Sequence, residues 1–485
     1  MNAPLRRLSV AVMLLFGLLL LNANYLQVVR ADALHHDSHN PRLIAEEYSR
    51  ERGPILVGGK PIAQSVATND RLKYLRKYSA GKLYAPATGF YSIVYGSSGI
   101  EQAANSILAG TDDSLFVRRV IDLLTGAQPK GGSVALTLNP AAQKAAYDGL
   151  GKLHARGAVV AIDPSTGAIL ALVSTPSYDP NELSSHDTAT VRKNYDRLSL
   201  LKSRPMLDRA LRQTYPPGST FKLVTAAAAL ESGKYSPDTK VDNAARLNLP
   251  QTSSDLPNEN GGPCTSSGVA TLTIALENSC NVAFGHIGLD LGADVLRTQA
   301  DKFGFDQAFQ VPMRSVASHF PEAPNPPQTA QSAIGQFDVR ATPLQMAMVA
   351  AAIANRGVLM APYLIREVQA PDLSVLDTTK PRALGTAVSP QTAASLTQMM
   401  IKVVDQGTGT NGQIPGIKVA GKTGTAQQGA GRTPHAWFVS FAPADTDPKV
   451  AVAVIVEDGA RQNEITGNGL AAPIAQTVMR AVLGR

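Results

Sequence analysis

The sequence predicts an exported α/β protein with one large domain of strands and helices, a smaller N-terminal domain and an apolar helix at the N-terminus. Three observations support this. Residues 8–26 are dominated by apolar side chains, residues 40–130 are polar and rich in turn-forming residues, and strand-like runs occur at both ends of region 131–485. Apolar residues make up 44% of the 485-residue chain, which allows a large core and excludes a disordered or fibrous protein.

The N-terminal segment, residues 1–30, is interpreted as a short cytoplasmic tail followed by an uncleaved transmembrane signal-anchor. Arg6 and Arg7 precede the apolar run 8–26, which is long enough to cross the hydrocarbon core. A single arginine follows the run, so the charge bias places the N-terminus in the cytoplasm. The alternative is a signal peptide cleaved at residues 31–33. In both cases the rest of the chain is exported, and we expect an extracytoplasmic catalytic domain at the cell membrane.

Composition and the early histidines argue against metal and nucleic-acid binding. The net charge is +7 without a run of five basic residues, and aromatic residues are only 5%, so no nucleic-acid partner is expected. His35, His36 and His39 could place two ligands on one helix face. Without a further ligand nearby they are interpreted as solvent-exposed, and no metal or cofactor is expected.

Residues 31–130 are predicted to form a separate non-catalytic domain. Its basic segment 71–77 is expected to be helical, and a Gln-Pro-Lys-Gly-Gly turn at 128–132 ends the domain. Region 131–485 is predicted to be the catalytic domain.

The catalytic domain is expected to contain one sheet assembled from its two ends. Strands 157–162 and 168–173 form a predicted hairpin, and three more strand-like runs follow near the C-terminus. The strands expected in addition to this hairpin are 133–138, 417–423, 437–441 and 450–457, and the helices are 140–154, 345–355 and 474–482.

The search for catalytic residues begins with a nucleophile. A Gly-x-Ser-x-Gly elbow and a P-loop are both missing, and the glycine-rich segment 405–410 is expected to be a flexible loop. A different motif, Ser-x-x-Lys, places a hydroxyl and an amine on one helix face, where a neutral amine can take the hydroxyl proton. It occurs at three places, where about two are expected by chance: Ser79/Lys82, Ser199/Lys202 and Ser219/Lys222.

Sequence context favours the third of these motifs. Ser219 follows Pro-Pro-Gly and opens an apolar helix, 221–230, whose N-terminal dipole favours negative charge nearby. Ser79 precedes a glycine in a turn-like segment, and Ser199 lies where a helix should end. An ordinary helix N-cap remains the alternative for Ser219.

Two further motifs follow in the order expected for a catalytic site. Ser-Cys-Asn at 279–281 precedes an apolar segment, and Lys-Thr-Gly-Thr at 422–425 lies on a predicted strand. Lys422 would lower the pKa of a neighbouring ammonium and attract a carboxylate. Gly424 would leave room for a substrate along the strand edge. A second Ser-x-Asn, at 38–40, is interpreted as accidental.

In this order, Ser-x-x-Lys, Ser-x-Asn and Lys-Thr-Gly resemble the signature of penicillin-binding proteins and serine β-lactamases. The similarity covers essentially the whole chain, since residues 52–56 resemble the start of a class B N-terminal domain and 335–347 resemble a transpeptidase domain. The ~100 residues before 130 are too few for a glycosyltransferase domain at a usual domain size. The chain is therefore identified as similar to class B penicillin-binding proteins of the actinobacterial cell-division type. This resemblance implies a five-stranded antiparallel sheet between helical layers and a pedestal-like or dimerisation N-terminal domain.

The resemblance also implies a reaction, D,D-transpeptidation of peptidoglycan. Ser219 would attack the penultimate D-Ala of a stem peptide ending in D-Ala-D-Ala, Lys222 would take its proton, and Ser279 would relay a proton to the leaving D-Ala. The backbone N–H groups of Ser219 and Thr425 would form the oxyanion hole. β-Lactams imitate this substrate and would acylate the same serine.

Substrate binding is implied for the remaining motif residues. Lys422, Thr423 and Thr425, with Gly424 between them, would hold the terminal carboxylate, and Asn281 would hold the peptide amide. Expected partners are cell-wall synthesis and division proteins, including a membrane glycosyltransferase, with a role in cell shape and division. A D,D-carboxypeptidase, a serine β-lactamase and a non-enzymatic penicillin sensor or scaffold remain alternatives.

Two residues outside the signature also lead to predictions. Cys280 occupies the middle of Ser-x-Asn, and in an exported protein it is expected to form a disulfide with Cys264, contributing about 3 kcal/mol. Two buried free thiols are the alternative. Trp437 is expected to pack in the core rather than to contact the substrate.

Overall fold

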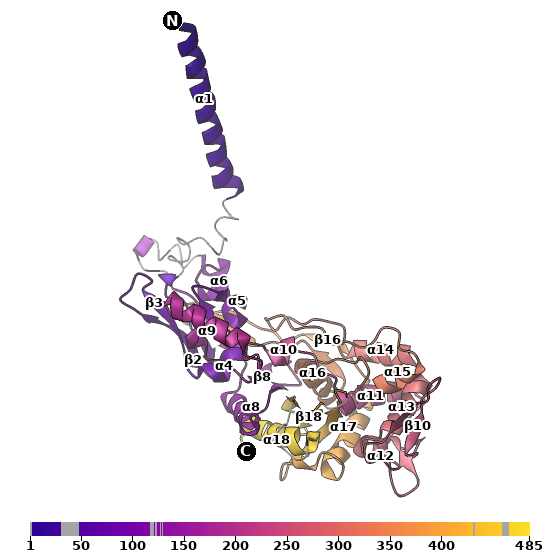
Figure 1. The fold of residues 1–485 in the computed structure, drawn as a ribbon. Helices are drawn as coiled ribbons and strands as arrows, with labels where there is room; N and C mark the ends of the chain where they lie inside the picture. The colour runs from indigo at the N-terminus through magenta and orange to yellow at the C-terminus, as the bar shows by residue number, and fades with distance from the viewer. Residues whose placement is uncertain are drawn as a thin grey trace.

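The structure is a computed structural model that describes residues 2–30, 48–116, 121, 124–126, 128, 130–429, 432–457 and 465–485. The three histidines and the alternative cleavage site lie outside the described residues. At the N-terminus, helix α1 (Asn2–Asn24) continues into η1 (Tyr25–Val29) and stands apart from the folded body (Figure 1). Ala3–Val29 is a helical stretch of 27 residues with no buried residue, and an 18-residue window within it has a mean hydropathy of 1.9, so length and composition suffice to cross a membrane.

The five-stranded sheet predicted from both ends of the catalytic region is present. Its order is β17-β18-β19-β7-β8, with every neighbouring pair antiparallel. The strands are β7 (Gly157–Ile162), β8 (Ile169–Thr175), β17 (Ala420–Ala426), β18 (His435–Ala442) and β19 (Val450–Val456). Strands β18, β19 and β7 are fully buried because helices cover both faces of the sheet, which explains their continuous apolar runs.

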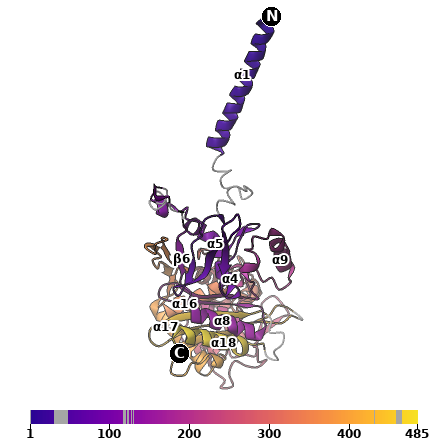
Figure 2. The ribbon, with the colours of Figure 1, turned by 90° about the vertical axis from the view of Figure 1, so that its left-hand side faces the viewer.

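Helices form a layer on each face of this sheet. One layer contains α8 (Pro140–Leu153) and α18 (Ala472–Val482), which lie side by side in Figure 2. Helices α16 (Pro343–Ala354), α11 (Lys222–Glu231) and α17 (Pro390–Asp405) belong to the layer on the other face. Alternate residues of each strand therefore enter two separate cores, for example Val159 with Leu150 and Ile474, and Val160 with Met346 and Trp437.

A second, six-stranded sheet combines segments that are distant in sequence. Its order is β15-β14-β6-β1-β2-β3, in which β1 and β6 are parallel and the other pairs antiparallel. The strands are β1 (Ile55–Val57), β2 (Lys60–Ala67), β3 (Tyr74–Tyr78), β6 (Ser133–Leu136), β14 (Ile365–Gln369) and β15 (Val375–Thr378). The strand predicted at 133–138 therefore pairs with the N-terminal region rather than with the central sheet.

The helix expected at 71–77 is wrong. The segment is a turn followed by β3, whose residues Arg76 and Tyr78 are buried while Lys77 between them is exposed. This two-residue period fits a strand, and β3 pairs with β2 along its length. The other predicted elements are confirmed, with their ends displaced by up to three residues.

The remaining elements are short strands and helices, mostly around the catalytic region. They are α4 (Gly81–Thr88), β4 (Tyr91–Ser92), β5 (Gly96–Ser97), α5 (Gly99–Ala103), α6 (Asn105–Leu108), η2 (Asp113–Leu115), η3 (Pro180–Glu182), α9 (Thr188–Leu200), α10 (Arg209–Arg212), η4 (Gly218–Phe221), β9 (Lys240–Val241), β10 (Arg246–Asn248), β11 (Asp255–Pro257), β12 (Ala270–Thr271), α12 (Leu272–Glu277), α13 (Asn281–Leu291), α14 (Ala293–Lys302), α15 (Pro326–Ser332), β13 (Val358–Met360), β16 (Ala383–Thr386), η5 (Thr410–Gly412) and η6 (Gly467–Ala471).

Candidate active site

Ser219 lies in the 3-10 turn η4, immediately before α11, and its side chain is partly exposed. Gly218 allows this sharp turn, because its φ of 54° lies in the left-handed region that favours glycine. Its N–H donates to the carbonyl of Gly335 at 3.0 Å, and an added Cβ would lie 2.9 Å from the carbonyl oxygen of Thr425. The turn that presents Ser219 is therefore packed directly against strand β17.

Lys222 is the first residue of α11, and its side chain is completely buried. Its Nζ donates to the Ser279 carbonyl at 2.6 Å and to Oδ1 of Asn281 at 2.8 Å. Burial, followed by the charge of Lys422, lowers the pKa of Lys222 well below its usual value of 10.5. A neutral amine has two hydrogens and one lone pair. The two acceptors take the hydrogens, and the lone pair remains available for a hydroxyl proton.

Ser279 connects the two lysines. It lies in the loop between α12 and α13 with a φ of 59°, a left-handed conformation that is costly for a non-glycine residue. Its Oγ accepts a hydrogen bond from Nζ of Lys422 at 2.9 Å, and Nζ of Lys222 lies 3.4 Å from the same oxygen. A hydroxyl between two amines can accept a proton from one side and donate one to the other, which is the geometry that a proton relay needs.

Lys422 lies on β17 and is also completely buried. Besides Ser279, its Nζ donates to the carbonyl of Thr423 at 3.0 Å. Burial lowers the pKa of Lys422 from 10.5 to about 7, although Glu259 opposes the shift. A carboxylate entering beside Lys422 would favour the charged form, so substrate binding and protonation are coupled.

Gly424 has a different role from the one expected. A Cβ at this position would lie 2.9 Å from Cγ2 of Thr220, 3.1 Å from the Pro217 carbonyl and 3.1 Å from Cβ of Trp437. The missing side chain therefore makes room for the turn that holds Ser219, and for β18, rather than for a substrate. Gly424 thus fixes the distance between β17 and the nucleophile.

Trp437 confirms the prediction of core packing. It is completely buried and pairs with Gly424 across strands β17 and β18. Its indole Nε1 donates to the carbonyl of Pro216 at 3.0 Å. Trp437 therefore supports the segment that enters the nucleophile turn.

The predicted disulfide between Cys264 and Cys280 is present, with the two Cα atoms 5.4 Å apart. A second link holds the same loop, since Oδ1 of Asn258 accepts from the backbone N–H of Val282 at 3.0 Å. Both contacts fix the region around Ser279 to the segment before α12. The free-thiol alternative is therefore wrong.

The glycine-rich segment 405–410 is not the open, flexible loop that the sequence suggested. A Cβ on Gly407 would lie 2.6 Å from the carbonyl of Glu277, and one on Gly409 would lie 3.2 Å from the ring of Phe438. Thr408 between them places its Oγ1 2.7 Å from Oγ1 of Thr423. Sequence reasoning missed Thr408, and the only available signal was its place between two glycines.

Three of the four side chains on which the prediction depended lie in contact, and the fourth, Ser219, is close to them in the chain. Lys222, Ser279 and Lys422 are joined by hydrogen bonds, and Ser219 lies three residues before Lys222 on the same short helical segment. The other two Ser-x-x-Lys motifs are elsewhere: Ser79 is in a turn, and Ser199 is exposed in the last turn of α9. The second Ser-x-Asn lies outside the described residues.

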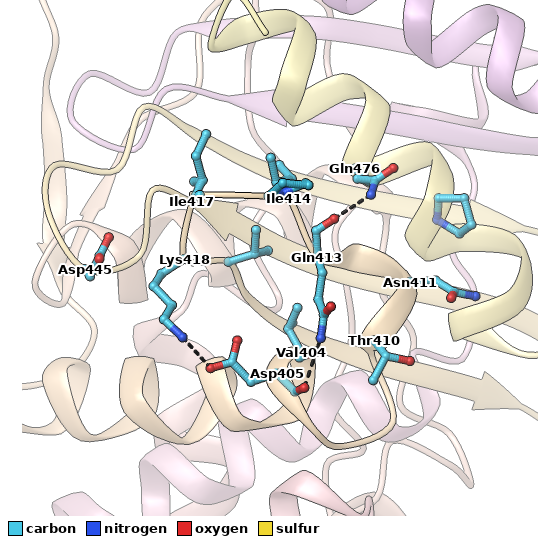
Figure 3. Close-up of a pocket in the computed structure, with 14 residues that line it drawn as sticks. Val404, Asp405, Thr410, Asn411, Gln413, Ile414, Ile417, Lys418, Asp445 and Gln476 are labelled. Carbon is cyan, nitrogen blue, oxygen red and sulfur yellow. Dashed lines mark hydrogen bonds and ion pairs between the residues drawn. The ribbon is translucent and has the colours of Figure 1, made fainter.

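A separate hollow of about 890 Å³ lies beside the end of α17 (Figure 3). In it, Nζ of Lys418 pairs with Asp405 at 2.7 Å, and Nε2 of Gln413 donates to the carbonyls of Val404 and Asp405. None of the motif residues lines it. Because these polar groups satisfy one another, we assign no chemistry to this hollow.

Comparison with known proteins agrees with this arrangement. Residues 157–480 match the family described as penicillin binding protein transpeptidase domain, and residues 52–134 match the penicillin binding protein A dimerisation domain. The chain is 46% identical to the peptidoglycan D,D-transpeptidases PbpA of Mycolicibacterium smegmatis and Mycobacterium tuberculosis, over 100% of its own length and 99% of theirs. A solved structure of M. tuberculosis penicillin-binding protein A, a ceftriaxone acyl-enzyme, superposes with a TM-score of 0.87 at 44% identity, covering 90% of this chain and 100% of that one. These matches confirm the resemblance to the actinobacterial class B type, and the chain belongs to the penicillin-binding protein transpeptidase family.

Proposed function

We propose that this chain cross-links peptidoglycan as a serine-type D,D-transpeptidase, with Ser219 as the nucleophile and Lys222 as its base. One observation supports this most directly: two buried lysines meet at the hydroxyl of Ser279, next to the turn that contains Ser219. A buried amine with a lowered pKa is the base that a serine needs when no histidine is present. The enzyme is inhibited by β-lactams, which acylate the same hydroxyl.

In the acylation step, Oγ of Ser219 forms a bond with the carbonyl carbon of the penultimate D-Ala. Lys222 takes the hydroxyl proton, and the backbone N–H groups of Ser219 and Thr425 stabilise the oxyanion. Loss of one such donor would raise the barrier by about 3 kcal/mol. The carbon–nitrogen bond then breaks, and the terminal D-Ala leaves as an amine that receives the proton through Ser279.

Substrate contacts come from β17 and α13. Lys422, Thr423 and Thr425 bind the terminal carboxylate. The hydroxyl of Thr423 is held in place by its hydrogen bond with the hydroxyl of Thr408. Asn281 binds the peptide amide with the second lone pair of its Oδ1, since the first accepts from Lys222. In the second half-reaction, the amine of another stem peptide attacks the acyl carbon, Oγ of Ser219 is released, and it regains a proton.

The proposal includes a topology and a division into domains, and the apolar N-terminal helix supports the first of these. Residues 1–30 anchor the protein in the cell membrane with the N-terminus in the cytoplasm, because two arginines precede α1's apolar run. Residues 31–130 form the non-catalytic domain and 131–485 the transpeptidase domain, whose strands β6, β14 and β15 extend the sheet that contains β1, β2 and β3. Because glycan polymerisation needs a separate enzyme, a membrane glycosyltransferase and division proteins are the partners that we propose for the N-terminal domain.

The test uses the full chain in detergent with a fluorescent penicillin, followed by a chase with unlabelled drug. Stable labelling that is lost in Ser219→Ala is expected. Ser199→Ala is the matched control, because it alters the same motif at an exposed helix end and should label normally. Labelling that survives in Ser219→Ala would contradict the proposal.

A second measurement separates the related activities. The protein is incubated with a stem pentapeptide and an amine acceptor, and the products are identified by mass spectrometry. A cross-linked dimer supports transpeptidation, whereas release of D-Ala with only hydrolysed peptide would indicate a carboxypeptidase. Rapid release of hydrolysed penicillin in the first experiment would instead indicate a β-lactamase.

A further inference from the structure

A buried carboxylate lies behind the nucleophile turn, outside the three motifs. Glu457 follows the last residue of β19 and is 9% exposed. Its Oε1 accepts hydrogen bonds from the hydroxyl of Tyr215 at 2.6 Å and from Nε of Arg209 at 2.7 Å. We call Tyr215, Arg209 and Glu457 the carboxylate anchor.

The arginine of the anchor is itself fixed on several sides. Arg209 is 2% exposed, and its other two nitrogens donate to the carbonyls of Ser203 at 2.6 Å and Arg204 at 3.2 Å. Nε of Arg156 lies 3.2 Å from the second oxygen of Glu457. These partners hold the Glu457 carboxylate in one position. Its Oε1, which accepts the hydrogen bond from Tyr215, is therefore fixed as well.

Tyr215 links the Glu457 carboxylate to the segment that precedes the nucleophile. Its backbone exchanges two hydrogen bonds with Ala341, and its ring packs edge-on against Trp437 with centroids 6.1 Å apart. Burial, followed by the charge of Glu457, raises the pKa of Tyr215 well above 10, so its hydroxyl remains a donor. Tyr215 lies four residues before Ser219, and the indole of Trp437 binds the carbonyl of Pro216 between them.

We propose that Glu457 is a positioning residue for catalysis: through the Tyr215 hydroxyl it fixes the turn that presents Ser219 to the substrate carbonyl. The proposal rests on the function above, with Ser219 as nucleophile. Neither Glu457 nor Tyr215 touches the reacting atoms. Their effect is on the alignment of Ser219, where a misplacement of about 1 Å costs roughly a hundredfold in rate.

The chain contains a matched control for this proposal. In the N-terminal region, Glu101 accepts from Nε of Arg52 and Nε of Arg76, both at 2.7 Å, and from the hydroxyl of Tyr78 at 3.1 Å. The chemistry is the same as in the carboxylate anchor, and all four residues are buried. Removing one tyrosine hydroxyl from either cluster leaves a carboxylate that two arginines still neutralise, so the two changes should cost similar stability.

The test compares Tyr215→Phe with Tyr78→Phe in the full chain in detergent. Time courses of acylation at several concentrations of fluorescent penicillin give the limiting acylation rate and the half-saturating concentration. We expect Tyr215→Phe to lower the limiting rate about tenfold, with an unchanged half-saturating concentration. Tyr78→Phe should acylate like the wild type, and both variants should show similar unfolding temperatures.

A spectroscopic measurement reports the turn itself. Trp437 is the only tryptophan of the chain, and it contacts both Tyr215 and Pro216. Tyr215→Phe should therefore change the tryptophan emission of the unliganded protein, and Tyr78→Phe should not.

Should Tyr215→Phe fail to fold, Glu457→Gln takes its place. It keeps an acceptor for the hydroxyl but removes the charge that holds Arg209, and about a threefold loss of limiting rate is expected.

Two outcomes would overturn the proposal. Acylation of Tyr215→Phe at the wild-type rate is one, and an equal loss in Tyr78→Phe is the other, because that would be a general stability effect. If instead Ser219→Ala still reacts with penicillin, the nucleophile assignment fails, and this result is distinct from either outcome above.

Discussion

Replacing Lys422 by methionine should change how stability depends on pH. Lys422 is completely buried, and its burial lowers its pKa from 10.5 to about 7. Between these two values the unfolded chain binds a proton at this position and the folded chain does not. Stability must therefore rise with pH across this window, because the unfolded state binds more protons.

The size of the effect follows from the shift. One pKa unit corresponds to about 1.4 kcal/mol, so the full window corresponds to a penalty of about 5 kcal/mol below pH 7 that disappears above pH 10.5. Lys222 also makes stability rise with pH, since its pKa is lowered too. Burial is the main cause of that shift, and Lys222 stays buried when Lys422 is replaced. In the variant, the slope of the unfolding free energy against pH should therefore be smaller by the contribution of one proton, about 1.4 kcal/mol per pH unit.

Thermal unfolding from pH 7 to pH 10 measures this difference. For a region of roughly 350 residues the unfolding entropy is about 0.75 kcal/mol/K, so the slopes of wild type and Lys422→Met should differ by about 2 °C per pH unit. The variant should be the more stable protein at pH 7, and the two curves should converge as the pH rises. Lys402→Met, at an exposed position on α17, is the control and should leave the slope unchanged.

Parallel curves for wild type and Lys422→Met would refute the reasoning. They would mean that Lys422 keeps its proton up to its ordinary pKa, with its hydrogen bonds to Ser279 and Thr423 compensating fully for burial. Lys422 would then be charged throughout, and the coupling between substrate carboxylate and lysine protonation would not exist.

Three other changes have defined outcomes. Joint replacement of Cys264 and Cys280 by serine should cost about 3 kcal/mol, or about 4 °C in unfolding temperature, and a thiol titration that finds free cysteines in the unreduced wild type would contradict this. Gly424→Ala should lower the limiting acylation rate by roughly 10- to 100-fold, since its Cβ would lie 2.9 Å from Cγ2 of Thr220, and normal acylation kinetics would show that the nucleophile turn can yield. Glu101→Gln should cost about 3–5 kcal/mol in thermal unfolding by leaving two buried arginines without their counter-charge, and an unchanged unfolding temperature would exclude that role.

The central sheet was predictable because its strands are buried on both faces. Such strands read as continuous apolar runs, and the run at 450–457 gave β19 within one residue. Strand β17 was displaced from 417–423 to 420–426 because two residues of its second half, Gly424 and Ala426, have little intrinsic strand preference. Pairing with Trp437 and its neighbours on β18 keeps this segment extended, so a tertiary contact overrides local propensity.

The six-stranded sheet could not be predicted in the same way. Its strands β6 and β14 are far apart in the sequence. They pair through residues such as Ser133 and Gln369, whose side chains form a hydrogen bond of 2.9 Å. Neither segment contains a local feature that selects the other. The helix error at 71–77 has a different cause, because four basic residues at mixed spacing hid the two-residue period of burial at Arg76 and Tyr78.

The catalytic motifs were found because each combines a reactive group with a backbone requirement visible in sequence. Ser219 follows a glycine, and Lys422 precedes Thr-Gly. Tyr215, Thr408 and Glu457 have no such mark. Their roles depend on partners elsewhere in the chain, as with Tyr215 and Glu457, which are 242 residues apart, so only the folded structure identifies them.

The middle position of Ser-x-Asn explains how the relay serine can hold a strained conformation. Ser279 has a left-handed φ, which costs about 1–3 kcal/mol for a non-glycine residue. The residues on either side of Cys280 face the lysines, whereas Cys280 itself bonds to Cys264. The bridge can therefore offset the strain, at about 3 kcal/mol, without placing any atom in the reaction path. Cys280, which has no part in the chemistry, is thus the residue that attaches the loop and keeps the hydroxyl of Ser279 between the two lysines.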